Sequence, residues 1–337
     1  MCGIVGFTGR ENALPILIKG LYSLEYRGYD SAGIAAFTKE GLRVVKTRGR
    51  IANLEEKIRE VGCDMECTCG IGHTRWATHG EPSDRNSHPH LGGKGKVAVV
   101  HNGIIENYKE LRERLEAHGY EFKSETDTET VAHLVDYLHT GKQEDLAKTV
   151  LAAVQRLRGS YALGVVSMDN TQEIVAARRG NPLVIGIGEG ENMIASDITA
   201  IISRTRKFII LDDNEVAIVR PDEVIVMNEF GDKVEKEVQT VNWDMSAAEK
   251  GGYQHFMLKE IMEQPKAVTD TVTPRIKNNA VCATLKTSTS SAAALRCMQA
   301  WSASALSRQC AASAARPRSQ ANSAMKIRSS AKRICAS

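Results

Sequence analysis

The chain begins Met1-Cys2-Gly3-Ile4-Val5-Gly6, and this segment holds the residue on which the expected fold depends. A second residue as small as cysteine favours removal of the initiator Met, which would leave Cys2 with a free α-amine. An α-amine has an unperturbed pKa of about 7.7–8.0, so its neutral form can accept the proton of the thiol. The segment therefore predicts an N-terminal nucleophile that carries its own general base.

Three later segments offer groups that such a nucleophile needs. His73-Thr-Arg-Trp-Ala-Thr-His-Gly80 combines a guanidinium, an aromatic ring and several donors after an apolar strand. Asn102-Gly103 is predicted to form a turn after a strand, and it offers the side-chain amide and backbone N–H that stabilise an oxyanion. Ser124-Glu-Thr-Asp-Thr-Glu129 places the Asp127 carboxylate at a helix start.

Each of these residues also has a purely structural explanation. Asp127 alone is more typical of a helix N-cap, Arg75 of a surface ion pair, and Trp76 of a core anchor. A cysteine at position 2 is in most proteins incidental. The structural explanations lose weight here because all four features occur in one chain.

Residues 1–240 alternate between short strands and helices, judged by their apolar periodicity. The later strands follow one another without a helix between each pair, which disfavours a parallel doubly wound sheet and favours two antiparallel sheets covered by helices. Gly186-Ile-Gly-Glu-Gly190 is predicted to be a tight turn rather than a nucleotide loop, because no helix follows it. We expect strands at 2–8, 34–37, 43–47, 97–101, 161–168, 173–178, 183–187 and 208–210, and helices at 13–25, 107–118, 128–139 and 144–157.

The overall composition is that of a soluble globular protein. Of 337 residues, 42% are hydrophobic and 25% are charged. No run approaches the roughly 18 apolar residues of a membrane span, and no basic segment followed by an apolar one opens the chain. We therefore expect a cytoplasmic protein with no membrane partner.

The eight cysteines are expected to be reduced thiols, because no secretory signal is visible. Cys63, Cys67, Cys69 and His73 lie close together in the sequence. Their spacing lacks the paired C-x2-C arrangement of a zinc site, so we expect no metal there.

The net charge of +3 is the sum of two unlike regions. Residues 1–275 carry a net charge of −7, whereas residues 276–337 carry +10 with no acidic residue and no glycine. Such a break indicates segments of different origin. A basic arm for nucleic acid is the alternative that the charge suggests, but no aromatic platform accompanies it, and no nucleic-acid partner is expected.

Several long segments together resemble the glutaminase half of the glutamine–fructose-6-phosphate aminotransferase (isomerising) family. The resemblance runs from residue 2 to about residue 275, in the order and spacing of that family. The matching segments are Cys2–Gly6, Leu24–Gly33, His73–Gly80, His101–Asn107, Ser124–Glu129, Arg179–Gly186 and Ala195–Asp197.

The resemblance implies an α+β fold, a four-layer αββα N-terminal-nucleophile hydrolase sandwich of two antiparallel sheets. It also implies the reaction, in which Cys2 attacks the amide of L-glutamine, releases ammonia and leaves a γ-glutamyl thioester that water hydrolyses. No metal or organic cofactor is expected. In the intact family, the ammonia converts fructose 6-phosphate to glucosamine 6-phosphate.

The same resemblance implies roles for individual residues. Cys2 would be the nucleophile, with Asn102 and Gly103 forming the oxyanion hole. Arg75 would bind the α-carboxylate of glutamine by a bidentate pair, and Asp127 would bind its α-ammonium group. The remaining pocket residues implied are Trp76, Thr78 and His79, with Arg27 in a nearby loop.

Two other functions stay open. The first is another class II amidotransferase, such as a phosphoribosyl-pyrophosphate or asparagine-forming enzyme, which Leu24–Gly33 and His73–Gly80 argue against. The second is a catalytically silent binding or regulatory fragment.

The resemblance implies three regions, which are a glutaminase domain at 2–240, a linker at 241–275 and a basic tail at 276–337. In the family, the linker leads to an isomerase domain that we expect this chain to lack. Read one base earlier, the codons for Ala292–Ala303 permit Cys-Gly-Thr-Ala-Met-His-Ala-Gly-Met-Val-Gly, which resembles the first signature of that domain. We therefore expect an out-of-frame, disordered tail, and the loss of any homodimer that the isomerase half would form.

Overall fold

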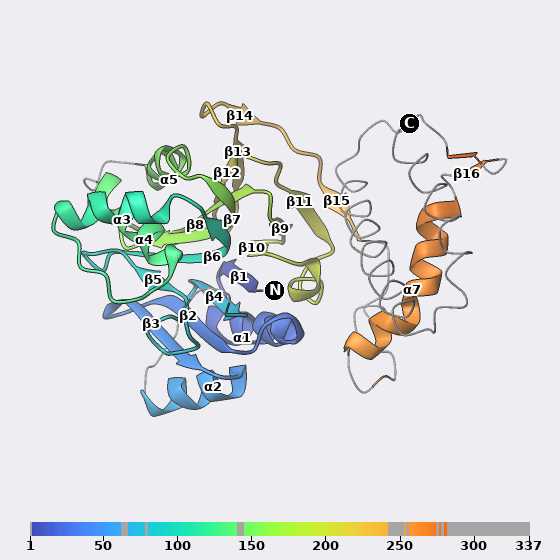
Figure 1. Cartoon of the computed structure of the whole chain (residues 1–337), viewed down its shortest axis with the longest axis horizontal. Helices are drawn as coiled ribbons and strands as arrows, with labels where there is room; N and C mark the ends of the chain where they lie inside the picture. Colours follow the sequence, from blue (N-terminus) through green and yellow to red (C-terminus); the bar gives the residue numbers. More distant parts are fainter. Residues whose placement is uncertain are drawn as a thin grey trace, which may run out of the picture. The chain divides into compact units, whose positions relative to one another are not determined.

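The computed structural model describes residues 2–61, 67–77, 80–139, 145–241, 253, 256–273, 276–277 and 280–281. The chain divides into two compact units, residues 1–252 and 253–337. The first unit contains two antiparallel sheets with helices on their outer faces (Figure 1).

The first sheet has eight strands, in the order β15-β11-β9-β10-β1-β4-β2-β3. The N-terminal strand β1 lies inside this sheet, where Val5 pairs with Ala195 of β10 and with Gly72 of β4. Cys2 therefore directly precedes a central strand. The strands are β1 Gly3–Thr8, β2 Ser31–Thr38, β3 Gly41–Arg48, β4 Cys69–Arg75, β9 Val184–Ile187, β10 Asn192–Ala195, β11 Lys207–Ile210 and β15 Gln239–Thr240.

The second sheet has seven strands, in the order β14-β13-β12-β8-β7-β6-β5. Its centre is formed by β6, β7 and β8, which are consecutive strands along the chain apart from the helices between β6 and β7. The strands are β5 His90–Leu91, β6 Val97–Ile105, β7 Gly159–Ser167, β8 Asn170–Arg179, β12 Glu215–Val219, β13 Val224–Met227 and β14 Lys233–Val234.

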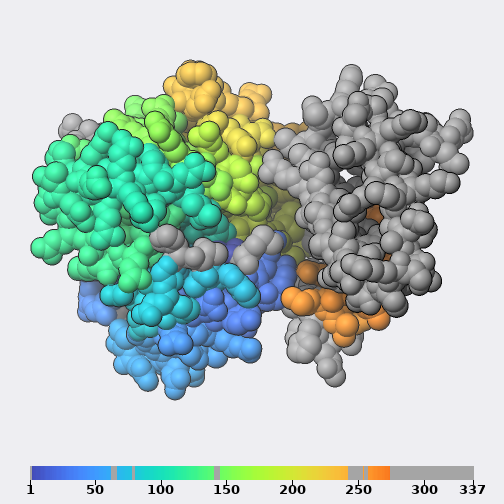
Figure 2. Space-filling view, viewed as in Figure 1, coloured from blue at the N-terminus to red at the C-terminus, as the bar shows by residue number. Residues whose placement is uncertain are grey.

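Helices cover the outer face of each sheet, and the space-filling view shows them at the surface, α2 in blue and α3 in green (Figure 2). The helix α1 and the helix α2 pack on the first sheet, and α3, α4 and α5 pack on the second. The helices are α1 Ala13–Leu24, α2 Ile51–Glu60, α3 Tyr108–Ala117, α4 Asp127–Leu138 and α5 Leu146–Val154, with short 3-10 turns at Glu25–Arg27 and Ile198–Ala200.

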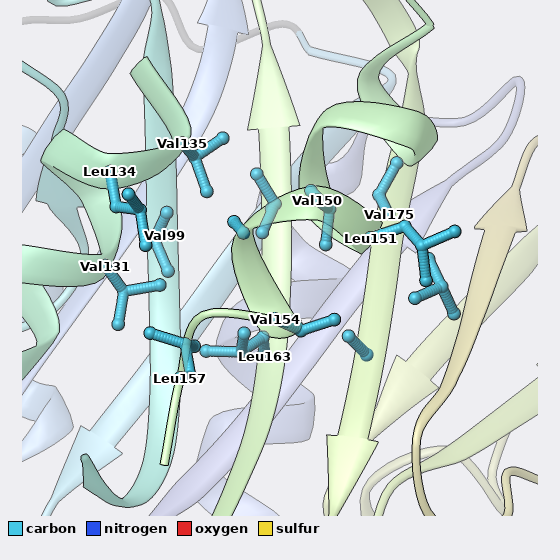
Figure 3. Close-up of a cluster of buried hydrophobic side chains, with 14 of the residues drawn as sticks. Val99, Val131, Leu134, Val135, Val150, Leu151, Val154, Leu157, Leu163 and Val175 are labelled. Atoms are coloured by element: carbon cyan, nitrogen blue, oxygen red, sulfur yellow. The ribbon is translucent and has the colours of Figure 1, made fainter. Parts of the chain in front are cut away.

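The strands are apolar on both faces. This is expected because helices cover the outer face of each sheet and the other sheet covers its inner face. Alternate residues of a strand point to opposite faces, so in β1 Ile4 enters the layer between the sheets while Val5 and Phe7 face the helices. In the outer layer of the second sheet, side chains of α4 and α5 meet Val99 and Leu163 (Figure 3). These three apolar layers confirm the predicted αββα sandwich.

One sequence expectation is wrong in a way that matters for the site. The sequence predicted that a strand ends at His101 and that Asn102-Gly103 turns, but β6 continues to Ile105 and pairs Gly103 with Tyr161 of β7. Gly103 has a φ of +133°, and a Cβ there would lie 2.1 Å from the carbonyl oxygen of Ser160. Glycine therefore lets the strand continue in close contact with its neighbour.

The other expected elements are present with ends shifted by a few residues. The elements of the first unit that were not predicted are α2, β5, β10, β12, β13, β14 and β15. The tight turn predicted at 186–190 begins at Gly188, after β9, and joins β9 to β10; the N–H of Gly188 donates to the carbonyl of Glu191 at 3.0 Å.

The described part of the second unit consists of α7 Phe256–Val272, which contains Pro265, and a hairpin of β16 Ile276–Lys277 with β17 Ala280–Val281. The helix α7 occupies much of the segment expected to be a linker. Residues 282–337 lie outside the described residues, so the tail stays a prediction. Among the described residues, no helix is both long and apolar enough to span a bilayer.

Gly33 of β2 should tolerate no side chain. A Cβ at Gly33 would lie 2.2 Å from the carbonyl oxygen of His88, whereas one at Gly72 of the adjacent strand would meet only flexible side chains, the nearest being Leu21 at 3.1 Å. We expect Gly33→Ala to lower the free energy of unfolding by about 3 kcal/mol or more and Gly72→Ala by about 1 kcal/mol. Urea unfolding of both variants checks this, and equal losses would contradict it.

Candidate active site

The Cys2 thiol lies against the backbone of Trp76. The N–H of Trp76 donates to Cys2 Sγ at 3.3 Å, and Sγ lies 3.6 Å from the carbonyl oxygen of Trp76. The pairing of Gly3 with Thr74 explains this approach, because it aligns the start of β1 with the end of β4. The half-buried thiol is therefore positioned by the sheet itself.

Burial raises the pKa of the Cys2 thiol above its ordinary value. The N–H of Trp76 and the charge of Arg75 oppose this effect and lower the pKa, whereas the Asp127 carboxylate raises it. Both charges thus act on the thiol. A thiol in this environment is protonated at neutral pH and needs a base before it can attack.

An amide donor lies next to Cys2. Asn102 Nδ2 donates to the carbonyl oxygen of Cys2 at 3.1 Å. Gly103 follows it on an exposed part of β6. The second sheet therefore brings Asn102 to Cys2, and Gly103 is the next residue of β6.

Arg75 is buried rather than at the surface. Arg75 is only 4% exposed, and its guanidinium donates to the carbonyls of Gly80 at 3.2 Å and Glu81 at 3.4 Å. Trp76 is not a core anchor, because it is 43% exposed and its ring meets the edge of Tyr29 at a centroid distance of 5.5 Å.

Asp127 is not the N-cap of its helix. Thr126 holds that position, and Asp127 is the first residue of α4. Its Oδ2 accepts a hydrogen bond from the N–H of Ile105 at 2.8 Å. The carboxylate is thereby fixed to the end of the strand that carries Asn102.

Arg27 lies in the 3-10 turn after α1 and forms a partly buried ion pair with Asp197, at 2.7 Å. This pair joins two of the segments that carried the family resemblance. Thr78 and His79 lie outside the described residues, so their expected roles stay predictions.

Sequence reasoning assigned no role to two residues that hold the site together. Asp30 accepts a hydrogen bond from the N–H of Ala77 at 2.9 Å, which fixes the backbone beside Trp76. Ser196 Oγ accepts one from the N–H of Ile4 at 2.9 Å, which fixes the start of β1. Both lie in segments that matched the family, but only the strand register reveals what they contact.

Four imidazoles are buried around the site, and each is kept neutral by burial. Desolvation lowers the pKa of His73 to about 3, and it lowers the pKa values of His88, His90 and His101 as well. The rings of His73 and His88 stack at a centroid distance of 4.1 Å.

The described residues contain no group of three or more His, Cys, Asp or Glu side chains that could hold a metal ion. Cys67 and Cys69 are buried thiols, and burial raises the pKa of Cys69 to about 12. Cys63 lies outside the described residues.

The buried imidazoles should make the fold sensitive to acid. In the unfolded chain histidine titrates near a pKa of ~6.5, whereas these rings keep depressed pKa values, so below pH ~6.5 the unfolded state binds more protons. Stability should fall from pH 6.5 downward, by about 2 kcal/mol per buried imidazole at pH 5. Urea unfolding from pH 7.5 to 5 measures this, with the exposed His118→Gln variant as control. A constant stability over that range would refute the prediction.

Comparison with known proteins shows which domains this chain resembles. A family model for the glutamine amidotransferase domain matches residues 73–203. Among solved structures, glutamine phosphoribosylpyrophosphate amidotransferase from B. subtilis is 27% identical with a TM-score of 0.58, and the match covers 68% of this chain and 49% of that one. An allosteric regulatory enzyme of purine biosynthesis is 28% identical with a TM-score of 0.59. Together with the two sheets described above, these matches confirm the N-terminal-nucleophile hydrolase fold.

Curated relatives are more similar still. The glutamine–fructose-6-phosphate aminotransferase (isomerizing) of Clostridium tetani is 53% identical over 276 residues, which cover 82% of this chain and 45% of that protein. The enzyme of the same name from Caldanaerobacter subterraneus subsp. tengcongensis is 54% identical over 279 residues, covering 83% and 45%. The chain thus spans about half the length of these relatives. These findings show that the chain is similar to the glutamine–fructose-6-phosphate aminotransferases over about 45% of their length, and that residues 73–203 match the glutamine amidotransferase domain.

Proposed function

We propose that Cys2 hydrolyses L-glutamine to L-glutamate and ammonia. The observation that carries this proposal is the placement of the Asn102 amide 3.1 Å from the Cys2 carbonyl, beside a thiol that burial keeps protonated. A desolvated nucleophile next to a fixed donor is the arrangement that acyl transfer requires.

The reaction begins with a proton transfer. Once Met1 is removed, the α-amine of Cys2 takes the thiol proton and Sγ attacks the side-chain carbonyl carbon of glutamine. The carbonyl becomes an oxyanion, which the Asn102 side chain and the Gly103 N–H stabilise. The C–N bond then breaks, and the α-amine returns the proton to the leaving ammonia.

Water completes the turnover. It attacks the γ-glutamyl thioester, the C–S bond breaks, and glutamate leaves as the thiol regains its proton. The same oxyanion donors serve this second step, since it passes through a tetrahedral intermediate at the same carbon.

Two charged residues select the amino-acid end of glutamine. The Arg75 guanidinium binds the α-carboxylate through a bidentate pair, and the Asp127 carboxylate binds the α-ammonium group. The effects of both charges on the Cys2 thiol support this assignment, because they indicate that both lie within electrostatic reach of the reacting sulfur. Trp76, Thr78 and His79 shape the remaining pocket, near the loop of Arg27.

The use of the ammonia is a further part of the proposal. The relatives carry the name of a fructose-6-phosphate aminotransferase, so ammonia from this domain serves the formation of glucosamine 6-phosphate in the cytoplasm when a sugar-phosphate isomerase domain is joined to it. For this chain alone, we propose glutamine hydrolysis only.

Removal of the thiol should abolish glutamine hydrolysis without unfolding the domain. We expect purified, Met1-processed protein to release glutamate and ammonia in equal amounts, and Cys2→Ala to release neither. A peptide tag retained before Cys2 should have the same effect, because it converts the amine into an amide that accepts no proton. Inactive wild-type protein with normal urea unfolding would support the silent-fragment alternative instead.

Substitution of Asp127 should separate substrate binding from chemistry. Asp127→Asn keeps an oxygen that can accept from the N–H of Ile105 but removes the negative charge. Loss of a charged hydrogen bond of about 1.5–3 kcal/mol should raise the KM for glutamine about 10–100-fold with a smaller effect on kcat. Glu110→Gln, on an exposed side chain of α3 paired with Arg114, should change KM less than about twofold. Equal effects of the two substitutions would contradict the assignment.

A further inference from the structure

His73 lies behind the proposed oxyanion donor. It is fully buried in β4, and its Nε2 lies 3.0 Å from Asn102 Oδ1 and 3.0 Å from the carbonyl oxygen of His101. We propose that His73 is a positioning residue, which fixes the orientation of the Asn102 amide so that its NH2 group faces Cys2. This inference rests on the proposed function, since it gives the Asn102 amide a role in glutamine hydrolysis.

Two backbone carbonyls determine the direction of the hydrogen bonds that link Cys2, Asn102 and His73. The Cys2 carbonyl can only accept, so the Asn102 group that faces it at 3.1 Å must be the NH2 group. Asn102 Oδ1 therefore faces His73. The His101 carbonyl can also only accept, so Nε2 of His73 must carry the hydrogen and donate to both oxygens.

The reversed amide is disfavoured at both ends. Turning Asn102 over would place its NH2 group against the Nε2–H of His73 and its oxygen against the Cys2 carbonyl. Each contact would then join two donors or two acceptors in a partly buried site, where unpaired polar groups are costly. The imidazole thus selects one of the two amide orientations.

The protonation state of His73 suits this role. Because burial lowers its pKa to about 3, the ring stays neutral at working pH and carries a single hydrogen. With that hydrogen on Nε2, Nδ1 is a bare acceptor, and it has no hydrogen-bond partner among the described residues. The alternative tautomer would leave Nε2 facing two oxygens with no hydrogen between them.

The ring itself is held in place. It stacks on His88 at a centroid distance of 4.1 Å, and the loop that carries His88 is anchored by Lys46, whose Nζ donates to the carbonyls of Ser87 at 2.8 Å and Pro89 at 3.2 Å. The absence of a side chain at Gly33 allows the His88 backbone to lie against β2. His73 is therefore a rigid support that touches no substrate.

The consequence concerns the second N–H of Asn102. One hydrogen of the NH2 group bonds the Cys2 carbonyl, and the other remains for the oxyanion. If the amide turned over, the oxyanion would meet an oxygen instead of a donor. The effect should appear in the chemical step and not in the binding of glutamine.

The test combines two substitutions at His73 with one at Asn102. His73→Gln retains an N–H that can reach Asn102 Oδ1, whereas His73→Leu removes the donor at similar volume. Because loss of one oxyanion donor costs about 100–1000-fold, we expect His73→Leu to lower kcat for glutamine hydrolysis about 10–100-fold with KM changed less than about threefold. His73→Gln should stay within about fivefold of wild type.

A double-mutant cycle shows whether His73 acts through Asn102. In an Asn102→Ala background there is no amide to orient, so His73→Leu should lower kcat by less than about threefold more. Alkylation of Cys2 by iodoacetamide forms no oxyanion, and its rate should stay within about twofold of wild type in His73→Leu. A purely structural defect would lower the rate in both backgrounds and alter alkylation.

The outcomes separate the two proposals. Inactive wild-type protein would refute the proposed function, whereas active wild type with an impaired Asn102→Ala and an unimpaired His73→Leu would refute only the positioning role. Additive effects of His73→Leu and Asn102→Ala in the double-mutant cycle would also refute the positioning role. Where the leucine variant is too unstable to assay, His73→Phe gives the same comparison, because it keeps a ring against His88 and still lacks the donor.

Discussion

The antiparallel pairing of β1 with its two neighbours is the constraint on which the rest of the site depends. A chain terminus is ordinarily free to move, yet here Ile4 exchanges hydrogen bonds with Ser196 on one side and pairs with His73 of β4 on the other. With both faces of the strand buried as well, Cys2 has a fixed position. The strand that follows Cys2 is thereby paired on both edges and buried on both faces.

The remaining groups of the site come from the second sheet, so the site exists only where the two sheets meet. β6 brings Asn102 to the Cys2 carbonyl, and Asp127 is tied to the same strand through the N–H of Ile105. The bond from His73 to Asn102 joins the sheets directly. The geometry of the site therefore depends on how the two sheets pack against each other.

Much of this arrangement could be predicted from the sequence. The predictions failed where the structure depends on pairing between strands that are distant in the sequence. Alternation, helix periodicity and the motifs around Cys2, Arg75 and Asp127 are local signals, and the two-sheet architecture followed from them. Asn102-Gly103 has strong turn propensity, but its pairing with the strand at 159–167 overrides that propensity. The partner of Asp30 was equally out of reach, because it depends on the register between β2 and β4.

The site contains two kinds of polar group, namely charged side chains and neutral hydrogen-bonding side chains. Arg75 lowers the pKa of the Cys2 thiol and Asp127 raises it, so the two charges that would recognise an amino acid oppose each other at the sulfur. Burial then dominates and keeps the thiol protonated until a base acts on it. Around the carbonyl that would react, only neutral groups are needed, namely the Asn102 amide and the His73 imidazole behind it. A protonated imidazole at His73 would add a third charge to a buried region, and desolvation prevents it. The two charges therefore shift the pKa of the thiol in opposite directions, and burial has the largest effect on it.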